Sequence, residues 1–276
     1  MQEPVLVYRN FLYLKVSAAA VGLSLLAYIL HTPFGEPNGG TWLGYTLGTL
    51  SLGIIVWLAW YGIRKRRYGV GRVRLEDWLS AHVYLGIALI VLATLHAGFQ
   101  VGWNVHTLAY VLMLIVIFSG MFGIYAYVSI PRQITENRAG LTLEQIMALI
   151  AELHEDCRKI AVTLGDEINE LVQRSAEESR IGGGVWQQLS GHDRSCPTAL
   201  ALARVRVIAR DLPLGHSEIG RKLVLLLARQ NELLGQARRD VRFKAIVDVW
   251  LFIHVPTTFA LLAALIAHVI AVFFYW

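Results

Sequence analysis

Two apolar segments of the chain each contain a pair of histidines separated by 14 residues. The first pair is His82 and His96, and the second is His254 and His268. In an α-helix a 14-residue step advances about 21 Å and returns to within about 40° of the same face. Each segment, if helical, therefore presents two imidazoles on one side at well separated depths. Two such helices side by side would form two bis-histidine sites, the axial ligand set that completes a low-spin heme iron.

The histidine pairs lie in a chain whose composition is typical of a membrane protein. Of its 276 residues, 55% are hydrophobic and 16% are charged, and the mean hydropathy is +0.50. Several apolar runs reach the roughly 20 residues that a helix needs to cross the hydrocarbon core of a bilayer. We expect an all-α, polytopic helical bundle with five spans, over residues 12–31, 43–62, 79–99, 106–128 and 245–275.

Basic residues between the predicted spans indicate the orientation. The connection after the second span contains six of them: Arg64, Lys65, Arg66, Arg67, Arg72 and Arg74. The connections after the first and third spans, residues 31–41 and 100–105, contain no lysine or arginine. Because basic loops stay in the cytoplasm, we expect a multi-pass protein of a bacterial-type plasma (inner) membrane, with its N-terminus inside and its C-terminus outside. The net charge of +5 needs no nucleic-acid partner, since the basic residues cluster beside span ends.

This orientation predicts how the histidines pair. The third and fifth spans both run from inside to outside, so His82 and His254 lie near the inner surface, and His96 and His268 near the outer one. A lone histidine in a membrane helix is usually a packing or hydrogen-bonding residue. Two equally spaced pairs at matching depths favour ligation. Zinc fits this pattern less well than heme iron, because two imidazoles leave the usual three or four protein ligands of zinc incomplete.

The pattern resembles known heme proteins. Two histidines with 13 residues between them, on each of two parallel spans, resemble the cytochrome b of quinol–cytochrome c oxidoreductases. Ligands on the third and fifth spans resemble the ferric reductase and NADPH oxidase transmembrane domain. The resemblance implies two non-covalent b-type hemes with His82, His254, His96 and His268 as axial ligands of the iron. Two departures stand out: the sequence has no sixth span after the fifth, and more than a hundred residues separate spans four and five.

The domain organisation follows from the spans. Residues 1–128 hold spans one to four, residues 129–244 form a cytoplasmic insert, and residues 245–276 hold span five. Thr142 and Gln145 have the spacing of a helix capping box. An apolar stripe at three- and four-residue steps then predicts one amphipathic helix, with Leu143, Ile146, Ile150, Leu153, Ile160, Leu164, Ile168 and Leu171 on its apolar face. We expect a loop at 181–197 and helices at 198–211 and 217–243, the last continuing into span five.

The insert lacks the motifs of a redox cofactor site. Gly182-Gly183-Gly184 is not followed by Lys-Ser/Thr, no GxGxxG is present, and Cys157 and Cys196 form no CxxC. Electrons that enter from the cytoplasm would therefore come from another subunit, a flavin or iron–sulfur protein. An outer-face cytochrome or another acceptor would take them on the other side. The apolar stripes of the insert would pack within a bundle or against such a partner.

Three functions fit these features. The first is an electron conduit between redox partners, without a catalytic residue of its own. The second is a quinol- or quinone-reacting subunit, or a reductase of an external acceptor, with His31 and His106 near the place where a quinone headgroup would dock. The third is a heme-free scaffold or signalling protein. Small residues that would let helices or porphyrins approach closely are Gly86, Gly98, Ser119, Gly120 and Gly123.

Overall fold

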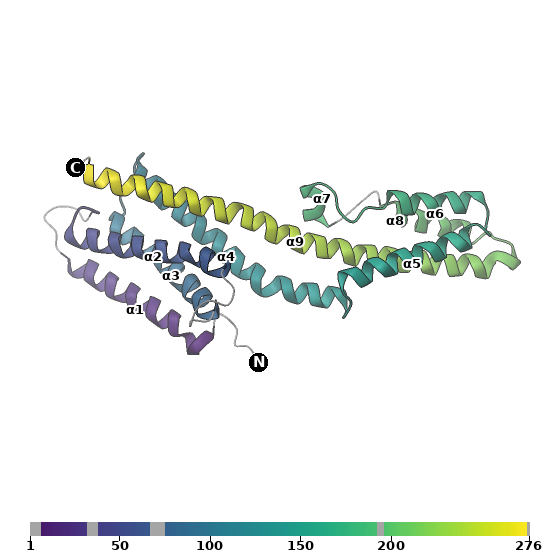
Figure 1. Ribbon diagram of the computed structural model, residues 1–276, viewed down its shortest axis with the longest axis horizontal. Helices are drawn as coiled ribbons and strands as arrows, with labels where there is room; N and C mark the ends of the chain where they lie inside the picture. The colour runs from purple at the N-terminus through teal and green to yellow at the C-terminus, as the bar shows by residue number, and fades with distance from the viewer. Residues whose placement is uncertain (1–6, 32–37, 67–74, 192–195, 275–276) are drawn as a thin grey trace. The chain divides into compact units, whose positions relative to one another are not determined.

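The computed structural model describes residues 7–31, 38–66, 75–191 and 196–274. Within these ranges all regular structure is helical and no strand occurs, so the predicted all-α fold is confirmed (Figure 1). The helices are α1 (Tyr8–Leu30), α2 (Trp42–Arg66), α3 (Leu75–Ala97), α4 (Val105–Arg138), α5 (Leu143–Ala161), α6 (Asp166–Glu178), α7 (Val185–Ser190), α8 (Pro197–Ile208) and α9 (Leu214–Phe274). The chain divides into two compact units, which are described separately: unit 1 contains Met1–Ile124 and Trp250–Trp276, and unit 2 contains Tyr125–Val249.

Five helical stretches are long and apolar enough to cross a membrane, as the sequence predicts. The first three are Arg9–Leu30, Trp42–Arg64 and Asp77–Ala97, and the other two lie within α4 and α9. Regular right-handed geometry in α1 begins at Leu12, after three residues with positive φ. α4 continues beyond the predicted span to Arg138 and ends where Ala139 and Gly140 take φ values of 48° and 89°. A left-handed residue after the last turn is a common way to end a helix.

α3 is the central helix of unit 1. It packs against both α1 and α2, and its side chains Leu89, Leu92 and Leu95 are almost completely buried. Leu92 and Leu95 pack against α2. Leu89 belongs to a second cluster that it shares with three other helices, through Ile55 of α2, Met113 of α4 and Leu261 of α9. The helix that carries His82 and His96 is thus held from several sides, which fixes the depth and rotation of both imidazoles.

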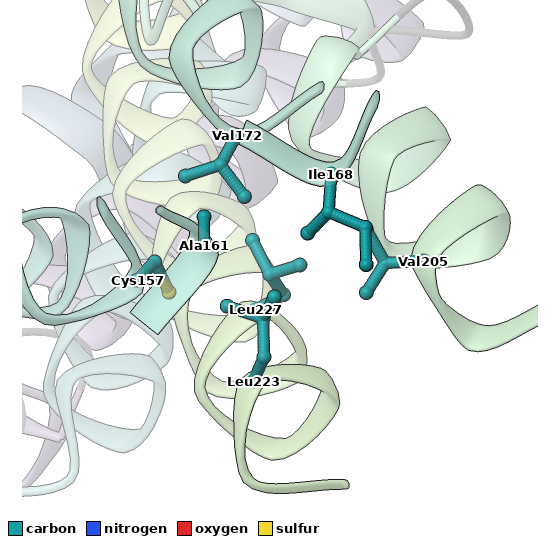
Figure 2. Close-up of a cluster of buried hydrophobic side chains, with 7 residues drawn as sticks. All are labelled: Cys157, Ala161, Ile168, Val172, Val205, Leu223 and Leu227. Atoms are coloured by element: carbon teal, nitrogen blue, oxygen red, sulfur yellow. The ribbon is translucent and has the colours of Figure 1, made fainter. Parts of the chain in front are cut away.

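Unit 2 has its own core, to which four helices contribute. Figure 2 shows its buried side chains: Cys157 and Ala161 from α5, Ile168 and Val172 from α6, Val205 from α8, and Leu223 and Leu227 from α9. The prediction of one helix along residues 143–171 is wrong. The chain leaves the helix after Ala161, and Gly165 takes a φ of 111° before α6 begins. A positive φ suits glycine and interrupts a right-handed helix, so the apolar stripe is divided between two packed helices.

The ends of the unit 2 helices agree with several local signals. Thr142 and Gln145 form the predicted capping box, because each side chain accepts a hydrogen bond from the other residue's backbone N–H. Pro197 occupies the first turn of α8, a position where its missing N–H costs nothing. The predicted loop at 181–197 contains the short helix α7, and residues 192–195 of that loop lie outside the described ranges. The predicted continuity of 217–243 with span five is confirmed by the single helix α9.

A polar network joins the end of α4 to α9 within unit 2. Asp240 is only 4% exposed and accepts hydrogen bonds from Asn137 Nδ2, at 2.8 Å, and from Arg138 Nε. Asn137 also donates to the backbone carbonyl of Gln236 at 2.9 Å and accepts from Arg239 at 2.5 Å. A buried carboxylate is tolerated only when it is paired in this way. The network therefore fixes the register between the two helices.

Candidate functional site

The four predicted ligands form two pairs within unit 1, each with one histidine from α3 and one from α9. In one pair, the ring centroids of His96 and His268 are 6.0 Å apart and the ring planes are inclined by 83°. A metal–imidazole bond is about 2 Å long, so two rings on opposite sides of one metal have centroids about 6 Å apart. The spacing between His96 and His268 is thus compatible with a shared iron.

The ring of His96 lies against the backbone of α2. Its Nδ1 is 2.7 Å from the carbonyl oxygen of Gly44, to which the ring N–H donates. One turn further along α2, a Cβ at Gly48 would lie only 2.6 Å from His96 Cε1. Glycine at position 48 therefore makes room for the imidazole. Because Nδ1 carries the donated proton, Nε2 of His96 keeps its lone pair for a metal.

His268 makes a contact that the sequence does not predict. Its Nδ1 lies 2.6 Å from Nδ1 of His106, in the first turn of α4. The two rings meet edge to face, with centroids 4.5 Å apart and planes at 87°. Residues 106 and 268 are far apart in the sequence, and no spacing rule connects them. The sequence analysis placed His106 only near the end of a span.

In the other pair, His82 and His254 lie close enough for their imidazoles to interact electrostatically. The His82 ring is 5.2 Å from the ring of Tyr61 on α2. Its Nδ1 is buried and has no hydrogen-bond partner. An unpaired buried nitrogen costs free energy, and coordination of a metal would satisfy it. At His82 the available nitrogen is therefore Nδ1, whereas in His96 it is Nε2.

His254 is oriented by Ser119 of α4. The Ser119 hydroxyl donates its proton to the carbonyl of Val116 at 2.9 Å, so its oxygen accepts from His254 Nδ1 at 2.8 Å. The second ring nitrogen, Nε2, again remains for a ligand. A Cβ at Gly120 would lie 3.5 Å from His254 Cε1, which is ordinary contact. Ser119 and Gly120 were predicted as small residues at a close approach, and both lie beside His254.

Trp250 is a further residue of this site. Its indole N–H donates to the backbone carbonyl of Ser119 at 2.8 Å, and its ring centroid is 5.4 Å from that of His254. A Cβ at Gly123 would come within 2.1 Å of the indole, so this crossing of α4 and α9 requires glycine at position 123. Trp250 precedes His254 by one helical turn, which is the signal by which the sequence could have suggested it.

The other singled-out residues have different surroundings. His31 meets Trp42 edge to face at 5.2 Å, and its Nε2 is buried without a hydrogen-bond partner. A Cβ at Gly86 would be 4.0 Å from Leu58, and Gly98 takes a φ of 58° just after α3. Arg72 and Arg74 lie outside the described ranges.

Each pair offers two protein ligands. In the described part of the chain, no three or more His, Cys, Asp or Glu side chains are grouped so that they could hold a metal ion. Two imidazoles are too few for a structural zinc site and suffice for a heme iron, whose other four ligands come from the porphyrin. The donor set and the free ring nitrogens therefore fit heme.

Comparisons with protein-family models, with curated proteins and with solved structures give no match to this chain. The function is accordingly inferred from the geometry of the histidines and the packing around them.

Proposed function

We propose that the protein is a di-heme cytochrome b subunit that carries electrons across a membrane between redox partners. The observation that carries this proposal is the facing arrangement of equally spaced histidines on α3 and α9. His96 and His268 are separated by 6.0 Å between ring centroids, and the second pair repeats the arrangement 14 residues away. The supporting helices are long and apolar enough to cross a membrane.

In this proposal His82 and His254 bind one iron, and His96 and His268 bind the other. Two b-type hemes would supply the one-electron chemistry that amino-acid side chains lack. The chain's own contribution is to orient the ligand rings. His96 donates to the Gly44 carbonyl and His254 to the Ser119 hydroxyl, and these bonds fix the tautomer that leaves Nε2 unprotonated.

The distance between the two sites suits transfer across a bilayer. The 14-residue spacing corresponds to about 21 Å along a helix, within a hydrocarbon core about 30 Å thick. One site would lie toward each surface, within reach of a partner on that side. By the distribution of basic residues, the N-terminus and the insert would be cytoplasmic and the C-terminus outside, in a bacterial-type plasma membrane.

Unit 2 would receive a cytoplasmic partner that carries a flavin or an iron–sulfur cluster, because its sequence lacks the motifs for either cofactor. Its described surface exposes large apolar side chains, among them Trp186, Leu200 and Leu225. Exposed apolar side chains of this size are typical of interfaces when they gather in a patch. On the outer side, a cytochrome or another acceptor would take the electrons.

Heme analysis of the purified protein tests the proposal. Pyridine hemochrome spectra together with a protein assay should give two b hemes per chain, none of them covalently attached. One heme or none would contradict the proposal, and a reduced-minus-oxidised spectrum without heme bands would favour a heme-free scaffold. Rapid heme reduction by a quinol analogue would identify a quinol-oxidising subunit instead of a conduit between protein partners.

A further inference from the structure

We propose that His106 is a positioning residue for His268. It accepts a hydrogen bond from the ligand ring at Nδ1, orients that ring and lowers the midpoint potential of the heme that His96 and His268 bind. This inference rests on the proposed function. It concerns a residue that belongs to neither histidine pair and whose role the 14-residue spacing does not predict.

The contact is short and the position of His106 is fixed. The two Nδ1 atoms are 2.6 Å apart, and the rings meet edge to face at 4.5 Å. His106 lies in the first turn of α4, which Asn104 caps: the Asn104 side chain accepts from the backbone N–H of Thr107 at 2.9 Å, and its carbonyl accepts from Leu108 at 3.1 Å. A capped first turn holds the backbone of His106 in place.

Ligation decides the direction of this hydrogen bond. A neutral imidazole has one protonated nitrogen and one nitrogen with a free lone pair. If His268 binds iron through Nε2, its proton must be on Nδ1, so His268 donates. His106 then accepts at Nδ1 and carries its own proton on Nε2. The arrangement follows the general pattern in which a metal-bound histidine donates its second ring N–H to a fixed acceptor.

The acceptor distinguishes His268 from two of the other ligands. His96 donates to a peptide carbonyl and His254 to a serine hydroxyl. An imidazole nitrogen is a stronger base than either oxygen, so it draws the proton of His268 further from the ring. The ligand becomes more electron-rich, which favours the more highly charged ferric iron. Loss of this acceptor should therefore raise the midpoint potential of one heme.

Redox titration of the purified holoprotein tests the inference, with His106→Leu and His106→Gln as the variants. Leucine removes the acceptor, whereas glutamine retains one in its amide oxygen. We expect His106→Leu to weaken the preference for ferric iron about tenfold, which corresponds to an upward shift of about 59 mV for one electron. His106→Gln should shift the potential less. His96→Ala, which removes a ligand of the same heme, identifies which of the two potentials belongs to it.

Ser119→Ala is the matched control, because it removes the acceptor of His254 and should move the other potential only. The inference is wrong if His106→Leu leaves both potentials unchanged or moves both equally, or if leucine and glutamine have the same effect, including equal loss of heme. Loss of one heme in His106→Leu with retention in His106→Gln supports it. A wild-type protein with fewer than two hemes would contradict the proposed function itself.

Discussion

Trp250 donates its indole N–H to the backbone carbonyl of Ser119, across 2.8 Å between helices α9 and α4. One turn later on α9, His254 donates to the hydroxyl of the same serine. Two successive turns of α9 are thus attached to one residue of α4. The orientation of a candidate iron ligand therefore depends on how closely these two helices approach, and this relationship can be tested by changing a single methyl group.

Gly123→Ala should disturb the crossing of α4 and α9. The new Cβ would lie 2.1 Å from the Trp250 indole, so the indole must move and its bond to Ser119 must lengthen or break. Overpacking of this kind costs about 1–3 kcal/mol. We expect the heme bound by His82 and His254 to fall to half occupancy or less, measured from heme content per chain.

The control for this variant is Gly120→Ala on the same helix, whose Cβ would make only ordinary contact, 3.5 Å from His254 Cε1. It should retain both hemes. Equal heme content in the two variants would show that the close approach at Gly123 does not determine the site.

Gly48→Ala should affect the opposite pair. Its Cβ would lie 2.6 Å from His96 Cε1, and the displaced ring would lose its hydrogen bond to Gly44. Heme content should drop toward one per chain, with the remaining heme spectrally unchanged. Gly53→Ala on the same helix has no atom within 4 Å of its new Cβ and should behave as wild type. Heme loss in Gly53→Ala as well would point to a general effect of alanine in α2.

Single histidine variants should sort into two spectral classes. His82→Ala and His254→Ala should remove one heme, and His96→Ala and His268→Ala the other, because each class shares one iron. Low-temperature reduced-minus-oxidised spectra distinguish the two hemes by their α-bands. If His82→Ala and His268→Ala shared a phenotype, the pairing would be wrong.

Cys157 of unit 2 should ionise only at high pH. Burial among apolar side chains, with a smaller contribution from the charge of Asp156, raises the pKa of its thiol from 9.0 to about 12. Thiolates are the reactive form, so in a Cys196→Ser background the labelling rate of the folded protein by iodoacetamide should keep rising with pH up to about 12. A plateau near pH 9 would contradict this expectation.

The same shift in the pKa of Cys157 predicts a dependence of stability on pH. Between pH 9 and about 12 the unfolded chain has lost the thiol proton and the folded chain retains it. The contribution of Cys157 to the free energy of unfolding is therefore complete below pH 9 and is lost as the pH rises toward 12. Denaturant titrations should show this loss in the wild type and not in Cys157→Ala.

Replacing residues 143–232 by a short linker should separate the two units functionally. The replacement leaves all four candidate ligands in place, together with the network of Asn137, Arg138 and Asp240 that joins α4 to α9. We expect two hemes per chain but no reduction by the cytoplasmic partner. Loss of both hemes from a protein that still reaches the membrane would mean that the insert supports the heme site.

Local sequence patterns predicted the elements of this fold well. Apolar runs of the right length identified all five long helices, because helix formation in an apolar segment depends on residues close in sequence. The capping box at Thr142 and Gln145 is local in the same sense. The stripe from Leu143 to Leu171 misled the prediction, since its periodicity continues through a break. The backbone at Gly165, with a φ of 111°, divides the stripe so that both halves pack against other helices.

The sequence by itself determined that four histidines occupy equivalent positions on two apolar helices, because helical periodicity alone relates residues 14 positions apart. Only the tertiary structure decided what surrounds them. Gly44, Ser119 and His106 reach the rings of His96, His254 and His268 from other helices. Such contacts depend on the rotation and crossing of packed helices, which arise from close approaches such as Gly48 to His96 and Gly123 to Trp250. No pattern along a single helix contains that information.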